Sequence, residues 1–275
     1  MSKIEKALKK AQSERAVINK DLVLKSEKGL GSEQGVGSGA LTVKKSNTNS
    51  LIRDMGEESV LSLENLIQRK IIFPEMESTG TANNYRVLRT KLLQKAKSEN
   101  FSVLITSCSK GFDSSYVTVN LSAAFSLDES KTSLIVDCNI EDSRIDKILG
   151  VKNINGLSDY IKNQDVAVED VIQNAGIPRL RVIPAGLPDS SSSEHFTSAR
   201  MKNLIDGLID RYPDRYLFID APPALDSVDT KILVELCDFV IIVVPYAKVT
   251  ANQISSCVKA INEEKLLGFV MSDVL

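Results

Sequence analysis

The chain has 275 residues, of which 43% are hydrophobic and 25% charged, and its formal net charge is −2. This length fits one α/β domain with additional segments, and the composition is ordinary for a globular protein. The charge balance lacks the basic footprint of a nucleic-acid-binding domain, so we expect no nucleic-acid partner.

Cysteine and histidine are too dispersed to predict a zinc site. The only histidine is His195, and no C-x-x-C pair occurs, whereas structural zinc sites need clustered Cys or His ligands. We therefore expect four reduced thiols. They belong to Cys108, Cys138, Cys237 and Cys257.

The sequence predicts neither a signal peptide nor a transmembrane segment. No apolar region follows the first residues, and the longest apolar run, 239–244, ends at Pro245 and is too short to cross a bilayer. We expect a cytoplasmic protein that reaches a membrane only through a partner or a surface helix.

Residues 1–20 are predicted to contain a basic amphipathic helix. Apolar residues between Ile4 and Ala11 recur at helical spacing, and the 20 residues hold six Lys or Arg against two Glu. Such a helix could dock on a membrane partner or an anionic lipid surface, or it could simply be solvated. The sequence leaves these alternatives open.

Residues 21–80 are predicted to be a flexible linker with a short helix over 58–70. Five glycines fall between residues 29 and 39 among small and polar residues. The glycine-rich stretch 35–39 has no predicted strand before it and no helix after it, so it is not expected to bind phosphate.

From residue 81 onwards, predicted strands and helices alternate. The strands are expected at 101–107, 133–137, 180–183, 216–220, 239–244 and 266–271, and the helices at 83–97, 114–127, 144–149, 156–163, 197–211, 227–236 and 250–264. This alternation predicts an α/β fold: a doubly wound, mainly parallel sheet over residues 81–275, covered by helices on both faces. Ligands of such sheets bind at the carboxyl ends of the strands.

Two of the predicted strands end in an acid at that edge. Asp220 ends the strand 216–220 and is followed by Ala-Pro-Pro, and Asp137 ends the strand 133–137. In P-loop NTPases an acid in this position holds Mg²⁺, directly or through water. The simpler alternative is an aspartate that only caps a turn.

The phosphate loop of a P-loop protein would follow the strand 101–107. A working loop reads G-x-x-x-x-G-K-[ST], but the chain contains no G-K-S or G-K-T. The segment from Thr106 to Ser122 instead reads TSCSKGFDSSYVTVNLS.

This segment and its surroundings resemble the bacterial tyrosine kinases of capsule and exopolysaccharide synthesis, which belong with the deviant-Walker P-loop ATPases. The loop of that family is roughly T-S-x-x-P-G-E-G-K-S-T-x-x-x-N-L-A. In this pattern, Asp113 stands at the second Gly and Ser114 at the Lys. The matching residues are Thr106, Ser107, Gly111, Ser115, Asn120 and Leu121.

The resemblance covers about residues 80–275. The family's D-x-P-P motif is intact at Asp220, and Asp137 matches the first acid of its D-x-D motif, whereas Asn139 and Glu141 replace the rest. The residues at 182–186 and 194–198 match a later segment of the family. No tyrosine follows Tyr246, although the family carries a C-terminal tyrosine cluster.

The resemblance also implies partners. Arg86 and Arg89 fit the family's E-x-x-R-x-x-R oligomerisation helix, although Asn83 replaces its Glu. The first residues resemble stand-alone kinases of exosortase-linked systems. A membrane polysaccharide co-polymerase, which determines chain length, is the implied partner, and it would hold the protein at the inner membrane.

The loop changes predict weak binding of ATP and Mg²⁺. Ser114 cannot replace an ammonium group, and Asp113 adds a carboxylate that would repel the triphosphate by about 4 kcal/mol at 4 Å and an effective dielectric near 20. Lys110 could compensate by swinging toward a phosphate. The predicted remnant of the nucleotide site consists of Lys110, Gly111, Asp113, Ser114 and Ser115.

These features favour a pseudokinase that regulates or scaffolds exopolysaccharide synthesis. One alternative is an active protein-tyrosine autokinase with an atypical loop, in which Asp137 and Asp220 would be the catalytic and Mg²⁺-binding acids. A second alternative is a partitioning-type positioning ATPase, which the family-like segments at 85–90 and 182–198 disfavour.

Overall fold

The fold was determined as a computed structural model that describes residues 61–73, 76, 80–97, 99–110, 114–188, 192–210, 214–246 and 248–272. The helix predicted within residues 1–20 and the glycine-rich stretch 29–39 lie outside these residues. Within the described ranges, no helix is both long enough and apolar enough to span a membrane.

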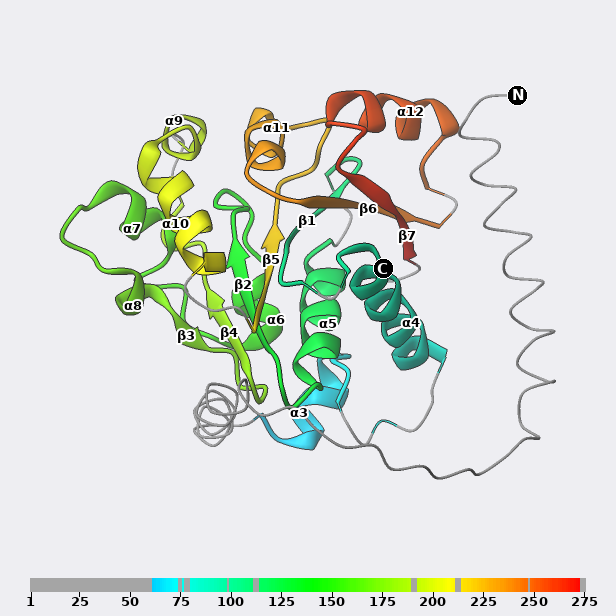
Figure 1. Ribbon diagram of the computed structural model, residues 1–275, viewed down its shortest axis with the longest axis horizontal. Helices are drawn as coiled ribbons and strands as arrows, with labels where there is room; N and C mark the ends of the chain where they lie inside the picture. The colour runs from blue at the N-terminus through cyan, green and yellow to red at the C-terminus, as the bar shows by residue number, and fades with distance from the viewer. Residues whose placement is uncertain are drawn as a thin grey trace, which may run out of the picture. The chain divides into compact units, whose positions relative to one another are not determined.

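Seven strands form one sheet in the order β3-β4-β2-β5-β1-β6-β7 (Figure 1). The strands are β1 (Ser102–Ser107), β2 (Thr132–Asp137), β3 (Gln173–Asn174), β4 (Leu180–Ile183), β5 (Arg215–Asp220), β6 (Phe239–Pro245) and β7 (Leu266–Ser272). Every neighbouring pair runs parallel except β3 and β4, which are antiparallel. The doubly wound, mainly parallel sheet predicted from the sequence is confirmed.

Helices cover both faces of the sheet because strand side chains alternate between two apolar clusters. Val103 and Ile105 of β1 belong to one cluster, and Leu104 to the other. The first cluster, here called the α5 face, is covered by α3 (Leu63–Gln68), α4 (Gly80–Lys95), α5 (Ser114–Ser126) and α6 (Ile145–Leu149). The second cluster, the α11 face, is covered by α7 (Leu157–Lys162), α8 (Val168–Val171), α9 (Ser192–Phe196), α10 (Ala199–Asp210), α11 (Val228–Glu235) and α12 (Ala251–Ala260).

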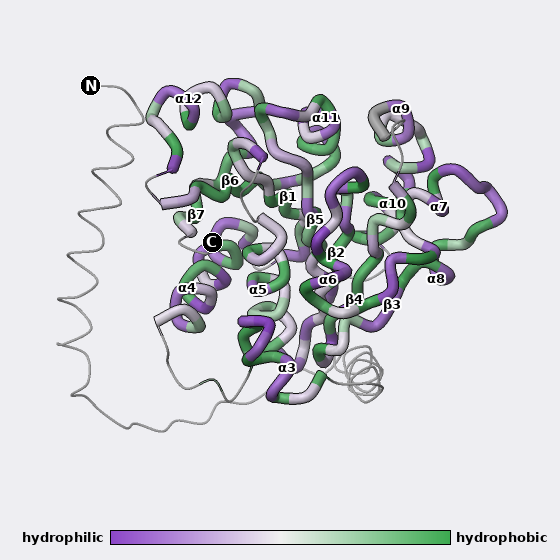
Figure 2. Tube along the Cα trace, turned by 180° about the vertical axis from the view of Figure 1, so that it is seen from behind, coloured by the Kyte–Doolittle hydropathy of each residue, from purple (hydrophilic) through white to green (hydrophobic). Residues whose placement is uncertain are grey.

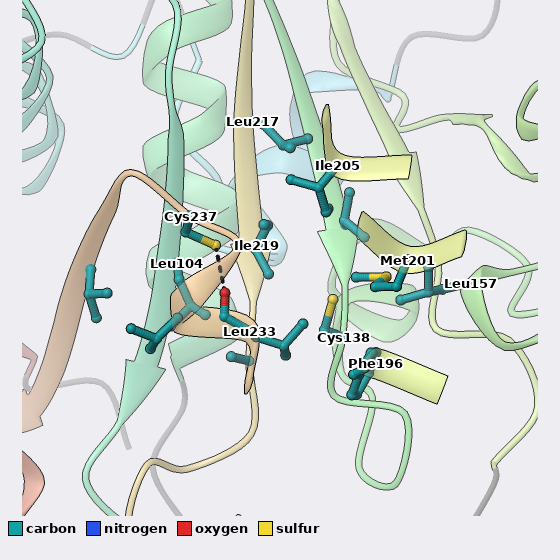
Figure 3. Close-up of a cluster of buried hydrophobic side chains, with 14 of the residues drawn as sticks. Leu104, Cys138, Leu157, Phe196, Met201, Ile205, Leu217, Ile219, Leu233 and Cys237 are labelled. Carbon is teal, nitrogen blue, oxygen red and sulfur yellow. Dashed lines mark hydrogen bonds between the residues drawn. The ribbon is translucent and has the colours of Figure 1, made fainter. Parts of the chain in front are cut away.

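Hydrophobic residues concentrate along the central strands, while outer segments such as α7–α8 carry more hydrophilic ones (Figure 2). Strand β1 is buried at all six positions, which is typical of a strand covered on both faces. The close-up of the α11 face shows side chains of β1 and β5 meeting those of α9, α10 and α11 (Figure 3). Because apolar side chains pack on both faces of the sheet, the strand ends at which the candidate site lies are held in place.

Residues 61–73 belong to the packed domain, although the sequence places them in the linker. Leu66, Ile71 and Ile72 are buried in the α5 face. The Ile72 amide donates a hydrogen bond of 2.9 Å to Oδ1 of Asn120 on α5. Residues assigned to the linker therefore pack against the domain, and α3 falls within the short helix predicted over 58–70.

Element boundaries differ from the predictions mainly after residue 160. Helix α12 ends at Ala260, not at 264, because Asn262 forms a turn in which its carbonyl accepts the Lys265 amide at 3.1 Å. Helix α10 begins at Ala199, two residues later than expected. The short elements α8, β3 and α9 were not predicted, since four, two and five residues are too few to establish a period.

Candidate functional site

The two strand-ending acids lie side by side at the carboxyl edge of the sheet. β2 and β5 are parallel neighbours, and their register pairs Asp137 with Asp220. Both side chains are 0% exposed. The Cys138 amide donates to the Asp220 carbonyl at 2.8 Å, which continues the pairing just beyond β2. The site predicted from two separate strands is therefore a single buried pair of carboxylates.

The first turns of α5 direct hydroxyl groups at Asp220. Ser115 Oγ donates to Asp220 Oδ2 at 2.6 Å, and Thr118 Oγ1 donates to Asp220 Oδ1 at 2.9 Å. Ser114 Oγ lies 3.5 Å from Asp220 Oδ1. Ser115 and Thr118 are three positions apart and Ser114 and Thr118 four, a spacing that places side chains on the same face of a helix, here toward Asp220. Both carboxylate oxygens of Asp220 thus have hydroxyl partners.

The turn after Asp220 is held in place by two threonines. Thr106 Oγ1 from β1 and Thr230 Oγ1 from α11 both donate to the Pro222 carbonyl at 2.6 Å. The Ala224 amide donates to the Ser107 carbonyl at 2.9 Å. These contacts connect the D-x-P-P turn to the end of β1, so the acid and the start of the loop keep a fixed spacing.

Asp137 has fewer hydroxyl partners than the neighbouring Asp220. Burial raises its pKa well above the usual range, and the adjacent Asp220 carboxylate raises it further. The Ser143 hydroxyl, which donates to Asp137 Oδ2 at 2.6 Å, and the Asn139 amide, at 3.0 Å from Oδ1, act in the opposite direction. The raised pKa of Asp137 favours its neutral form unless a cation enters the pair.

The loop between β1 and α5 is described only at its two ends. Gly111 and Asp113 lie outside the described residues, whereas Ser114 and Ser115 are buried at the start of α5. The side chain of Lys110 is exposed, and its backbone amide donates to Asp226 Oδ2 at 2.7 Å. Lys110 therefore lies at the rim of the site on a turn that Asp226 supports.

Among the described residues, no three His, Cys, Asp or Glu side chains gather closely enough to hold a metal. In P-loop proteins, Mg²⁺ is held by the Ser or Thr of the loop, a strand-ending Asp and the phosphates. Ser115 and Asp220, in contact at 2.6 Å, are the residues at these positions here.

The two arginines predicted for oligomerisation lie on α4. Arg89 donates from Nη1 to the Ala124 carbonyl at 2.7 Å, in the last turn of α5, where carbonyls lack helical partners. Arg86 is half-buried on the same helix. Arg89 therefore has a role inside the chain, and oligomerisation through Arg86 and Arg89 stays a prediction.

Several residues of the site were not singled out from the sequence. Thr118 supplies the second hydroxyl on Asp220, and Ser143 contacts Asp137. Thr118 could have been found because it lies one helical turn after Ser114 on the predicted helix. Ser143 and Asp226 reach the site from irregular segments, whose path no periodicity predicts.

Comparison with known proteins shows which proteins the chain is similar to. No protein-family model matches the chain. The chain is 30% identical over 175 residues to a putative tyrosine-protein kinase EpsB of Ralstonia nicotianae, covering 63% of this chain and 23% of that protein. It is 25% identical over 202 residues to the tyrosine-protein kinase CpsD of Streptococcus agalactiae, covering 72% of this chain and 84% of CpsD.

A solved structure gives the same fold. The kinase domain of Escherichia coli tyrosine kinase ETK superposes with a TM-score of 0.68 at 21% identity, covering 78% of this chain and 88% of that domain. The chain spans less than a quarter of the length of the Ralstonia relative but most of the streptococcal one. Both sequence relatives are named tyrosine-protein kinases and the superposed domain is a kinase domain, so the chain is similar to bacterial tyrosine kinases and has the fold of their kinase domain.

Proposed function

We propose that this protein is a pseudokinase that regulates or scaffolds exopolysaccharide synthesis together with a membrane polysaccharide co-polymerase. The observation that carries the proposal is the residue that opens α5: serine stands at position 114, where the family's loop has lysine. The side chains described at this edge therefore bring no ammonium group to the place where the β- and γ-phosphates would lie.

Electrostatics explains why the lost lysine matters for turnover. Phosphoryl transfer depends almost entirely on positioning and charge stabilisation, and removing one preorganised donor typically lowers a rate by roughly 10²–10³. A magnesium–triphosphate is thus a poor fit to the residues present.

Purified protein should bind MgATP weakly or not at all in isothermal titration calorimetry. The missing ammonium and the added carboxylate of Asp113 together should cost about 3–4 kcal/mol, which corresponds to roughly 10²–10³-fold in affinity. We expect the heat signal to be no larger for the wild-type protein than for the Asp220→Ala variant, which lacks the central carboxylate.

A micromolar dissociation constant for the wild type would overturn the pseudokinase proposal. If tyrosine phosphorylation also appeared in the purified protein, the active autokinase would be the correct alternative. Lys110→Ala would then test the exposed lysine at the rim as a substitute phosphate ligand. A circular-dichroism spectrum shared by all variants would show that differences in binding do not come from misfolding.

The membrane partner is proposed from the family alone, and residues 1–20 are its proposed contact. The protein should co-purify with membranes that contain the co-polymerase, and MgATP should not change the amount recovered, because a scaffold does not depend on turnover. A variant without residues 1–20 should be recovered less. Equal recovery from membranes with and without the co-polymerase would contradict the proposed partner.

A further inference from the structure

A groove lies on the outer side of the α11 face, between α11 and the start of α10. Helix α9 packs against both α10 and α11. Phe196 of α9, Met201 of α10 and Leu233 of α11 meet in the buried cluster beneath (Figure 3). The groove, here called the α10–α11 groove, has a volume of about 590 Å³, and its lining is drawn from residues 196–202 and 231–236. None of these residues belongs to the nucleotide site described above.

The base of the groove is apolar. Phe196 is buried there, and Ile232 and Leu236 are half-buried. Val228, one turn before Ile232, is 62% exposed. The three aliphatic residues recur every four positions, so they form a stripe along one side of α11. At 1.5 Å per residue this stripe extends about 12 Å, the length of roughly two helical turns.

The rim of the groove is positively charged. Lys202 on α10 and Lys231 on α11 are both exposed, and they approach the groove from its two walls. Among the described residues, neither lysine has an ion-pair partner. The one acid of the lining, Glu235, lies 3.7 Å from the Lys265 ammonium, which compensates its charge. The open cationic positions of the groove are therefore those of Lys202 and Lys231.

We propose that the α10–α11 groove docks an amphipathic helix of a partner protein, with aliphatic residues on one side and acidic residues beside them. Helix-in-groove recognition places apolar side chains at i, i+3, i+4 and i+7 against such a base. Acidic residues that flank the apolar ones would meet Lys202 and Lys231. The exposed rim leaves the outer side of an occupant in water, which suits the polar face of a helix better than a small molecule that must be enclosed.

The docking site is independent of the proposed pseudokinase function, because it shares no residue with the nucleotide site. It also lies on a part of the chain different from residues 1–20, the proposed contact of the membrane partner. Nucleotide affinity and peptide affinity are therefore separate measurements, and the failure of one proposal leaves the other to be judged by its own result.

The test measures fluorescence anisotropy of two labelled helical peptides with the full-length protein. Both peptides have about 12 residues with Leu at helical spacing, and the polar positions are Glu in one and Lys in the other. The acidic peptide should bind more tightly than the basic one by roughly tenfold, and salt should weaken its binding. Absence of binding by the acidic peptide, or equal affinities for the two peptides, would overturn the proposal.

Charge reversal locates the site. The double variant Lys202→Glu, Lys231→Glu should lose roughly tenfold in affinity for the acidic peptide and gain affinity for the basic one. The matched control is Lys91→Glu with Lys95→Glu, two exposed lysines on α4 at the other face of the sheet, and it should bind like the wild type. Equal losses in the two double variants would mean that the peptide responds to overall charge and would overturn the site.

Ile232→Asn tests the apolar base and should weaken the acidic peptide without changing the preference for acidic over basic. Binding unchanged in this folded variant would contradict the proposed groove. If Ile232→Asn does not fold, the lysine variants decide, since both lysines are exposed. Light scattering of the protein alone checks the other occupant: a dimer that Ile232→Asn or the groove lysine variant dissociates would assign the groove to a second copy and overturn the partner helix.

Discussion

Replacing Asp113 with Gly and Ser114 with Lys together should restore nucleotide binding. Position 114 opens α5, and Ser114 Oγ lies 3.5 Å from Asp220 Oδ1, so a lysine there would bring its ammonium beside the buried acid. The exchange also removes one repulsive carboxylate. We expect affinity for MgATP in a calorimetric titration to rise by roughly 10²–10³-fold.

The single variants distinguish the two contributions. Ser114→Lys alone should gain less, because Asp113 would still oppose the phosphates and could pair with the new lysine. Ser115→Thr keeps a hydroxyl that can donate to Asp220 and should gain nothing. Strong autophosphorylation is not expected in the double variant, since Asn139 and Glu141 still replace family residues. A folded double variant that binds no nucleotide would show that the pocket is lost beyond the loop.

Asn120→Ala should cause the largest loss of stability among substitutions of polar residues on α5. Asn120 is 4% exposed, accepts the Ile72 amide through Oδ1, and donates through Nδ2 to the Lys70 and Tyr116 carbonyls at 3.2 and 3.0 Å. The substitution leaves one buried amide and two part-buried carbonyls without this partner. The free energy of unfolding in urea should fall by roughly 3 kcal/mol.

The matched control is Asn84→Ala on the exposed face of α4. An exposed substitution of the same type should change the free energy of unfolding by less than about 0.7 kcal/mol. Hydrogen exchange should locate the effect, with loss of protection at residues 70–72 in Asn120→Ala only. Identical urea midpoints for the two variants would mean that residues 70–72 are held by apolar packing alone.

The sheet was predictable because its strands carry strong local signals. The apolar runs that became β2, β5 and β6 end in Asp or Pro, and the structure places these strands and β1 within one or two residues of the predicted limits. The strand order was not predictable from such signals. It depends on which apolar faces the crossover helices cover, a property of the whole chain.

The part of the site that could be predicted from the sequence consists of the acids that end two strands. Asp137 and Asp220 follow from position alone, and the structure pairs them. The hydroxyl partners of Asp220 depend on the pitch and placement of α5, and Ser143 reaches Asp137 from an irregular segment. Asn120 matched a family pattern beside the phosphate loop, yet its contacts are with residues 70–72, which had been assigned to the linker.

The position of β1 in the sheet also constrains the order of assembly during synthesis. Its neighbours on both sides come much later in the chain: Ser102 pairs with Leu217 of β5, and Val103 pairs with Phe239 of β6. When β1 leaves the ribosome, neither flanking strand exists, and its apolar residues have no edge to join. Loops of this length close slowly, and the waiting strand stays exposed to other chains. A fully buried strand is thus among the last to be enclosed, so a growing chain needs protection until β6 has been made.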